Sequence, residues 1–119
     1  MPKRVLVVDD NPLIRHLVCR MIEERAGYEV CAQASNGVEA IELAKKLLPH
    51  LVIMDLSMAV MNGIEAAREL KKLFPHVPII VFTQHADMAA HLSQLPVDRI
   101  VSKSDSAALM RFVYALAPV

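Results

Sequence analysis

Residues 5–10 have the sequence VLVVDD, in which four consecutive apolar residues are followed at once by two acids. A short unbroken run rich in β-branched residues predicts a strand that is buried on both faces, as in a parallel sheet covered by helices. Residues 51–55, LVIMD, repeat the pattern, and the apolar run at residues 77–82 is followed by a threonine. The chain therefore contains three candidates for central strands, and each ends at a polar residue.

The segments between these runs alternate between helical spacing and shorter mixed strands. Apolar residues recur every three or four positions after Pro12, which predicts a helix that ends near Gly27. Asn36 is followed by a glutamate three residues later, a pattern typical of a capped helix start, and residues 62–66 repeat it almost letter for letter. Two further helices are expected over residues 86–94 and from residue 104 or 105 onward. Mixed strands, which suit sheet edges, are expected at residues 28–34 and 97–102.

Five alternations of strand and helix predict an α/β fold with a doubly wound parallel sheet and helices on both faces. The three apolar strands should lie at the centre and the two mixed strands at the edges, which gives the strand order 2-1-3-4-5. Residues 1–119 are expected to form a single domain, and a longer natural protein that continues beyond it is compatible with the sequence.

Five polar side chains follow the carboxyl ends of the predicted strands. Asp9 and Asp10 follow the first strand, Asp55 the third, Thr83 the fourth and Lys103 the fifth. Since parallel strands end at one edge of a sheet, these groups should converge on the crevice where such folds bind ligands. Three carboxylates in one place repel one another, so either one of them stays protonated or a cation lies between them. A hard cation with oxygen ligands, Mg²⁺, is the simpler explanation and is expected here.

The same residues suit the transfer of a phosphoryl group. A carboxylate held beside a metal can act as a nucleophile and form an aspartyl phosphate on Asp55. The positive charge of Lys103 and the hydroxyl of Thr83 can then bind phosphoryl oxygens. This combination indicates a site for phosphoryl chemistry rather than for flavin, because the acids after the first strand would repel a bound phosphate.

Four motifs together resemble the receiver domain of two-component response regulators, which has a flavodoxin-like fold. They are VVDDN at residues 7–11, IMDLSM at 53–58 with MNG at 61–63, VFT at 81–83 and VSK at 101–103. The resemblance covers essentially the whole chain. It implies a phosphorylation-dependent switch rather than a turnover enzyme, since such a domain catalyses only its own phosphoryl transfer and dephosphorylation.

The resemblance also implies individual roles. Asp55 would be the acceptor, and Thr83 and Lys103 would hold the phosphoryl group. Asp10 and Asp55 would ligate Mg²⁺ directly with the backbone carbonyl of Ser57, while Asp9 would act largely through metal-bound water. The donor would be a sensor histidine kinase or a phosphotransfer protein. A fused output domain and a homodimer formed through the last helix and fifth strand are further expectations.

Several positions depart from the family pattern. Ala59 stands where the family usually has proline, Gln84 replaces a small residue after the threonine, and Ile100 replaces an aromatic residue before the lysine. Ser104 stands where a proline often follows the lysine. Because three of these lie in residues 84–105, we hypothesise that phosphate chemistry is retained while its readout is altered.

The composition limits which partners and which cellular location are expected for this domain. Thirteen basic and thirteen acidic residues cancel, so nucleic acid is not expected as a partner of this domain. No apolar run approaches the ~18 residues of a membrane span, and the two cysteines lack metal or disulfide-framework spacing, so a cytoplasmic domain with reduced thiols is expected. Two alternatives stay open: a receiver-like module that works by protein contacts alone, and a phosphatase with Asp9 as nucleophile, although the second acid of such phosphatases is missing.

Overall fold

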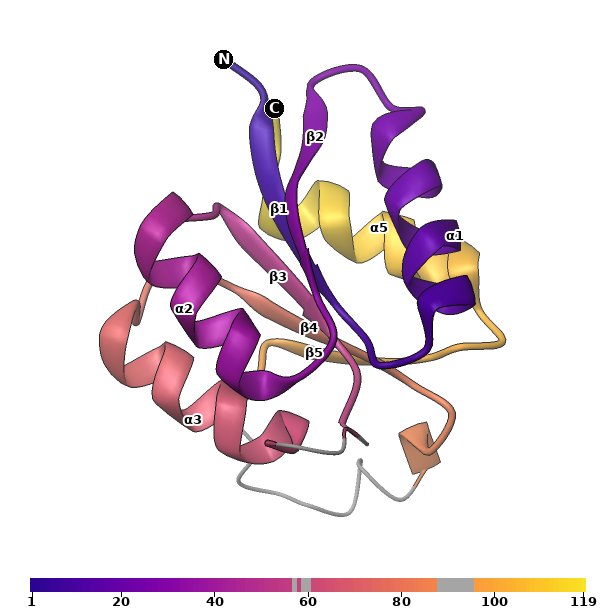
Figure 1. The fold of residues 1–119 in the computed structure, drawn as a ribbon. Helices are drawn as coiled ribbons and strands as arrows, with labels where there is room; N and C mark the ends of the chain where they lie inside the picture. The colour runs from indigo at the N-terminus through magenta and orange to yellow at the C-terminus, as the bar shows by residue number, and fades with distance from the viewer. Residues whose placement is uncertain (57, 59–60, 88–95) are drawn as a thin grey trace.

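The computed structural model describes residues 1–56, 58, 61–87 and 96–119 (Figure 1). Its single five-stranded sheet has the order β2-β1-β3-β4-β5, and all neighbouring strands are parallel, so the predicted fold class and strand order are confirmed. In the described part of the chain, the helices are too short or too polar to cross a membrane. The elements are β1 (Lys3–Val8), α1 (Pro12–Glu23), β2 (Tyr28–Ala34), α2 (Gly37–Leu47), β3 (Leu51–Met54), α3 (Gly63–Leu73), β4 (Ile79–Thr83), β5 (Arg99–Ser102) and α5 (Ser106–Leu116).

The sheet separates two layers of helices, with α1 and α5 on one face and α2 and α3 on the other (Figure 1). Strand β1 supplies both cores. Val5 and Val7 belong to the apolar cluster under α1 and α5, whereas Leu6 and Val8 belong to the cluster under α2 and α3. Because successive side chains of a strand point to opposite faces, a strand covered on both sides has no place for a polar residue. This explains the unbroken run VLVV.

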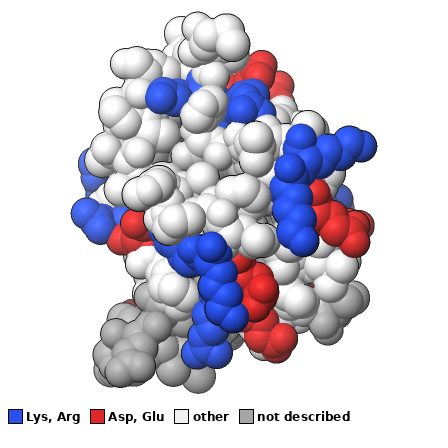
Figure 2. All heavy atoms as spheres, turned by 90° about the vertical axis from the view of Figure 1, so that its left-hand side faces the viewer, with Lys and Arg blue, Asp and Glu red and all other residues white. Residues whose placement is uncertain are grey.

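Burial also distinguishes the central strands from the edges. Every residue of β3 and β4 is buried, whereas β2 and β5 expose residues such as Glu29 and Arg99. The prediction that the mixed strands form the edges is therefore confirmed. On the side of the molecule that carries α2 and α3, basic and acidic side chains are interspersed (Figure 2), and Lys72 pairs there with Glu69 at 3.3 Å.

Asparagine side chains begin three of the helices. The Oδ1 atoms of Asn11, Asn36 and Asn62 accept hydrogen bonds from backbone N–H groups two or three residues later. Glu39 completes the predicted cap of α2, but its carboxylate accepts the backbone N–H of Ser35, at 2.8 Å, instead of that of the capping residue. The repeated sequence at the starts of α2 and α3 therefore produces the same asparagine cap twice, whereas Glu39 binds Ser35 and Glu65 binds the side chain of Asn62.

Three strands begin at other residues than predicted, and α1 ends at Glu23 rather than near Gly27. Strand β1 begins at Lys3, two residues before the apolar run at residues 5–8. Strands β4 and β5 each begin two residues later than expected, at Ile79 and Arg99. Pro78 has no N–H that could pair in a sheet, so β4 begins after it. The side chain of Asp98 accepts the N–H of Ile79 at 2.7 Å, and β5 begins after Asp98. The last helix begins after Asp105, as predicted. Most of the helix predicted at residues 86–94 lies outside the described residues.

Candidate functional site

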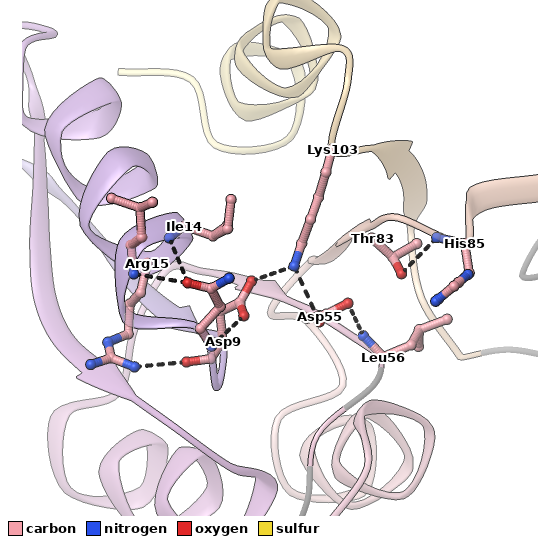
Figure 3. Close-up of polar contacts among 10 residues, drawn as sticks. Asp9, Ile14, Arg15, Asp55, Leu56, Thr83, His85 and Lys103 are labelled. Carbon is pink, nitrogen blue, oxygen red and sulfur yellow. Dashed lines mark hydrogen bonds and ion pairs between the residues drawn. The ribbon is translucent and has the colours of Figure 1, made fainter.

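The structure brings the five predicted strand-end residues together at the carboxyl edge of the sheet, and Figure 3 labels four of them. Asp9 directly follows β1, Asp55 follows β3, and Lys103 follows β5, while Thr83 is the last residue of β4. The β1 and β3 ends are locked together because the N–H of Asp55 donates to the carbonyl of Val8 at 3.1 Å. Topology therefore places these groups, although they are separated by up to 94 residues in sequence.

Three carboxylates form the acidic part of the site. Asp9, Asp10 and Asp55 each offer a carboxylate oxygen, and these atoms all lie within 4.8 Å of one another. Asp9 and Asp55 are 3% and 6% exposed, whereas Asp10 is open to solvent. Clustered carboxylate oxygens with one open side are the donor set that Mg²⁺ takes, since this ion keeps several waters and binds one or two carboxylates. The residues thus fit the predicted metal.

Lys103 lies between two of these acids. Its Nζ atom is 2.8 Å from Oδ2 of Asp9 and 3.2 Å from Oδ2 of Asp55, and its side chain is only 9% exposed. Burial alone would lower the pKa of the Lys103 ammonium, but the hydrogen bond to Asp9 and the charges of Asp55 and Asp9 outweigh it and raise that pKa above its usual value. Lys103 is therefore a firmly positive group that faces Asp55.

Asp55 is held by both of its carboxylate oxygens. Oδ1 accepts the backbone N–H of Leu56 at 2.8 Å, and Oδ2 faces the ammonium of Lys103. The carbonyl of Leu56 in turn accepts the N–H of Gly63, at 2.8 Å, at the start of α3. The carboxylate is consequently fixed in orientation at the edge of the site.

Thr83 is fully buried, and its Oγ1 accepts the backbone N–H of His85 at 3.2 Å. Its carbonyl accepts the N–H of Lys103 at 2.9 Å, so the ends of β4 and β5 are connected directly at the site. Figure 3 shows Thr83 on the opposite side of Asp55 from Asp9. Ser57, the remaining predicted ligand, lies outside the described residues.

Arg15 belongs to the surroundings of the site and was not anticipated from the sequence. From α1 its Nη1 donates to the carbonyl of Asp9 at 2.8 Å, and its Nε donates to Gln33 of β2 at 3.1 Å. Asp9 is also fixed through Oδ1, which accepts the N–H of Asn11 at 2.9 Å. A single arginine on an amphipathic helix usually has a solvated charge. The one sequence signal for a contact with the site was the position of Arg15, about one turn after the acidic pair Asp9 and Asp10.

Comparison with known proteins agrees with this geometry. The family described as the response regulator receiver domain matches residues 5–113. The chemotaxis protein CheY of Thermotoga maritima is 48% identical over 61 residues, which make up 51% of this chain and 50% of that protein. The transcriptional regulatory protein PdtaR of Mycobacterium tuberculosis is 47% identical over 58 residues, 49% of this chain and 28% of that protein. The matches thus span half or less of these curated relatives.

Solved structures extend the similarity over the whole domain. The response regulator protein TrrA of Thermotoga maritima, in complex with Mg²⁺-BeF, is 36% identical with a TM-score of 0.87 and covers 96% of this chain and 98% of its own. A LuxR-family two-component response regulator from Aurantimonas is 35% identical with a TM-score of 0.88, covering 98% of this chain and 86% of its own. On the match of residues 5–113, the fold and these structures, the chain belongs to the response regulator receiver domain family.

Proposed function

We propose that this receiver domain is a phosphorylation-dependent switch whose acceptor is Asp55. The observation that carries the proposal is the setting of that carboxylate: it is buried, it is oriented by Leu56 and Lys103, and it lies beside two further acids. Receiver domains act in phosphorylation-dependent signalling and are not, in general, turnover enzymes. The finer roles below are our proposal for this chain.

The transfer step needs a donor with a labile phosphoryl group, and we propose a phosphohistidine. A carboxylate oxygen of Asp55 attacks phosphorus and forms the new P–O bond, while the P–N bond breaks and its electron pair leaves with the imidazole, which takes up a proton. Lys103 and the hydroxyl of Thr83 are the groups proposed to bind the phosphoryl oxygens. A fixed ammonium stabilises the negative charge that develops on the phosphoryl oxygens, without first having to reorganise.

Mg²⁺ is the proposed cofactor, with Asp10, Asp55 and the backbone carbonyl of Ser57 as its protein ligands. Asp9, whose two carboxylate oxygens face the N–H of Asn11 and the ammonium of Lys103, is proposed to act largely through metal-bound water. When bound, the ion would neutralise charge among the acids and on the phosphoryl group. The relative TrrA was solved in complex with Mg²⁺-BeF.

The proposed partners are a sensor histidine kinase or a phosphotransfer protein. Beside the site, α1 exposes two leucines at helical spacing, Leu13 and Leu17, which are 66% and 48% exposed. Exposed leucines one turn apart suit the apolar face of a partner helix. This surface adjoins Asp10, so a docked helix could bring a phosphohistidine to the acceptor.

The domain is also proposed to act within a larger assembly. Residues 1–119 would form one receiver unit, and PdtaR, of which 28% is matched, is named a transcriptional regulatory protein. A fused output domain is therefore proposed. A homodimer through β5 and α5 is a further proposal, supported by the position of β5 at the edge of the sheet and by its exposed Arg99.

Acetyl phosphate labelling tests the acceptor. The wild-type chain should gain one phosphoryl group, seen by intact mass, in the presence of Mg²⁺, and should gain none in EDTA. The Asp55→Asn variant keeps the shape of the side chain but loses the nucleophile and should stay unlabelled. Equal labelling of the variant would exclude Asp55 as acceptor, whereas no labelling of a folded wild-type chain would favour the module that works by protein contacts alone. The departures at Gln84, Ile100 and Ser104 are what support that second candidate.

A further inference from the structure

The sequence contains one motif twice, and only one copy has an evident connection to the site. Residues 36–40 are NGVEA and residues 62–66 are NGIEA, and they begin α2 and α3. The second copy lies next to Asp55. The first copy lies on a different helix, follows an edge strand and contributes no charged group to the acidic cluster.

The second copy shows how a glycine can hold the loop that follows the acceptor, residues 55–62. The N–H of Gly63 donates to the carbonyl of Leu56 at 2.8 Å. A methyl group on its Cα would overlap the carbonyl oxygen of Asp55 and lie 2.7 Å from Cα of Leu56. The start of α3 is thus in close contact with the backbone of the acceptor residue itself.

The first copy holds the other end of the same loop. The N–H of Gly37 donates to the carbonyl of Met61 at 3.1 Å. A methyl group on Gly37 would lie 2.7 Å from each of three atoms of Met61: Cβ, Cγ and the carbonyl oxygen. Gly37 is buried and does not have a positive φ, so its backbone conformation does not demand glycine. The contact with Met61 is what excludes a side chain.

The connection between β2 and α2 also reaches the acidic side of the site. The carbonyl of Ala34 accepts the N–H of Asp9 at 3.0 Å, three residues before Gly37 contacts Met61. One short segment, residues 34–37, therefore contacts the backbone of an acid in the cluster and the far end of the acceptor loop. Residues 34–37 thus connect Asp9 and Met61 through backbone hydrogen bonds, without a charged side chain.

We propose that Gly37 is a positioning residue for the acceptor site: the start of α2 holds Met61, and together with Gly63 it fixes both ends of the loop that follows Asp55. This inference rests on the proposed function of Asp55. A side chain at residue 37 would displace Met61 and, through Asn62 and Gly63, the backbone of Asp55 and Leu56. Displacements of this kind matter because a misplacement of about 1 Å can cost about a hundredfold in rate.

Gly37→Ala separates this role from a local one. Alanine favours a helix over glycine, so a helix start with no further duty would tolerate the change or gain stability. As a positioning residue, Gly37 should instead show an effect at the site: Mg²⁺ affinity, followed by backbone NMR shifts, and the rate of labelling by acetyl phosphate should each fall about tenfold. All variants should be measured at a temperature at which circular dichroism shows each of them to be folded.

Val38→Ala is the matched control, because Val38 is the next residue of the same helix and is 39% exposed. It should leave both readouts within about twofold of the wild type. The double variant Gly37→Ala with Met61→Ala removes Cγ from the crowded contact, and it should recover part of the loss, as neighbouring residues do in a double-mutant cycle.

A folded Gly37→Ala chain with Mg²⁺ affinity and labelling rate like those of Val38→Ala would overturn the inference while leaving the proposed function intact. A wild-type chain that takes no phosphoryl group would overturn both. Where Gly37→Ala alone does not fold, Met61→Ala decides: it should weaken both readouts at the site, and unchanged values would refute the role of this contact.

Discussion

At the scale of single residues, the charge balance of the site depends on Lys103. Asp9 and Asp55 are almost fully buried and share this ammonium. Breaking a buried ion pair by removing one partner is costly because the charge that stays behind has lost both water and counter-ion. Lys103→Met should therefore lower the free energy of unfolding by about 3 kcal/mol in EDTA, measured by urea denaturation.

The ion pair between Lys71 and Asp98 offers the comparison. Its Nζ–Oδ2 distance is also 2.8 Å, but the two side chains are 22% and 33% exposed and lie away from the acidic cluster. Lys71→Met should cost about 1 kcal/mol. Added Mg²⁺ should restore part of the loss in the Lys103 variant and none in the Lys71 variant. Equal losses with no response to Mg²⁺ would contradict this account of the site.

His50 directly precedes β3, at the amino end of the strands. Its titration should make the free energy of unfolding depend on pH. Its Nδ1 accepts the backbone N–H of Arg4 at 2.9 Å, which requires a neutral ring. Burial, then the charges of Arg4 and Lys3, lower its pKa below 6.5. Because the unfolded chain takes up the proton first, this contribution is complete above pH 6.5 and is lost as the pH falls through the lower pKa of the folded state.

His50→Gln, which keeps an acceptor but does not titrate, should therefore flatten the loss of stability below pH 6.5 relative to the wild type. Urea denaturation over a series of pH values measures this difference, and an NMR titration of the His50 ring reports its pKa directly. A ring that titrates above 6.5 in the folded chain would refute the sign of the effect.

Residues of the site differ in how far the sequence could reveal them. Asp9, Asp55, Thr83 and Lys103 were predictable as neighbours, because each follows or ends a strand of a parallel sheet and such ends meet at one edge. Arg15 was not, because its contact with the carbonyl of Asp9 depends on how a long side chain folds back over a helix start. No spacing rule encodes that path.

At the scale of elements, helix α2 ends in a strained residue. Leu48 caps it with φ 51°, in the left-handed region that a leucine rarely adopts, and is 57% exposed. Arg4 holds this end, since its guanidinium donates to the carbonyls of Leu47 and of Leu48, the latter at 2.7 Å. Leu48→Gly should raise the free energy of unfolding by about 1 kcal/mol, because glycine adopts this conformation without strain.

The same substitution at the end of α3 should have the opposite sign. Leu73 is similarly exposed, at 43%, but is the last residue with helical conformation rather than the cap. Leu73→Gly should lower the free energy of unfolding by about 1 kcal/mol through loss of helix propensity. Urea denaturation of both variants gives the comparison, and destabilisation by Leu48→Gly would show that packing of the side chain outweighs backbone strain.

The exposed leucines of helix α1 allow phosphoryl transfer from a protein donor to be distinguished from transfer from a small-molecule donor. Replacing Leu13 and Leu17 by alanine removes exposed apolar surface without touching the acidic cluster. Transfer from a phosphorylated kinase domain should slow about tenfold, as for an interface that loses a central apolar contact, whereas labelling by acetyl phosphate should stay unchanged. Equal slowing with both donors would mean that the leucines act on the site itself rather than on docking.

Element boundaries followed from the sequence where a local signal existed. Asn36 and Asn62 marked helix starts because their side chains cap through neighbouring residues. Asp98 lies within the segment predicted as the last strand, residues 97–102, whereas its carboxylate binds Lys71 and the N–H of Ile79, residues 27 and 19 positions away. Long-range partners of this kind decide where β4 and β5 begin, and a single sequence does not show them.

At the scale of the whole molecule, the sheet connects the site to the face where readout is expected. Strands β4 and β5 are in register, with Val81 opposite Ile100 and Thr83 opposite Ser102. Movement of Thr83 toward a phosphoryl group would therefore pull on the neighbouring strand. Ile100 is only partly buried, and it lacks the large flat ring that can rotate between an exposed and a buried position when that strand responds.

We therefore expect a restricted response to beryllofluoride, which imitates the phosphoryl group. With Mg²⁺ and beryllofluoride, backbone NMR shifts should be large around Asp9, Asp55 and Lys103 and small over the rest of residues 84–105. Thr83→Ala should change the response at β5 little, because the usual coupling from threonine to an aromatic ring has no ring to act on. Broad shifts through residues 84–105 that disappear in Thr83→Ala would establish conventional coupling. In that case the substitutions at Gln84 and Ile100 would leave the switch intact.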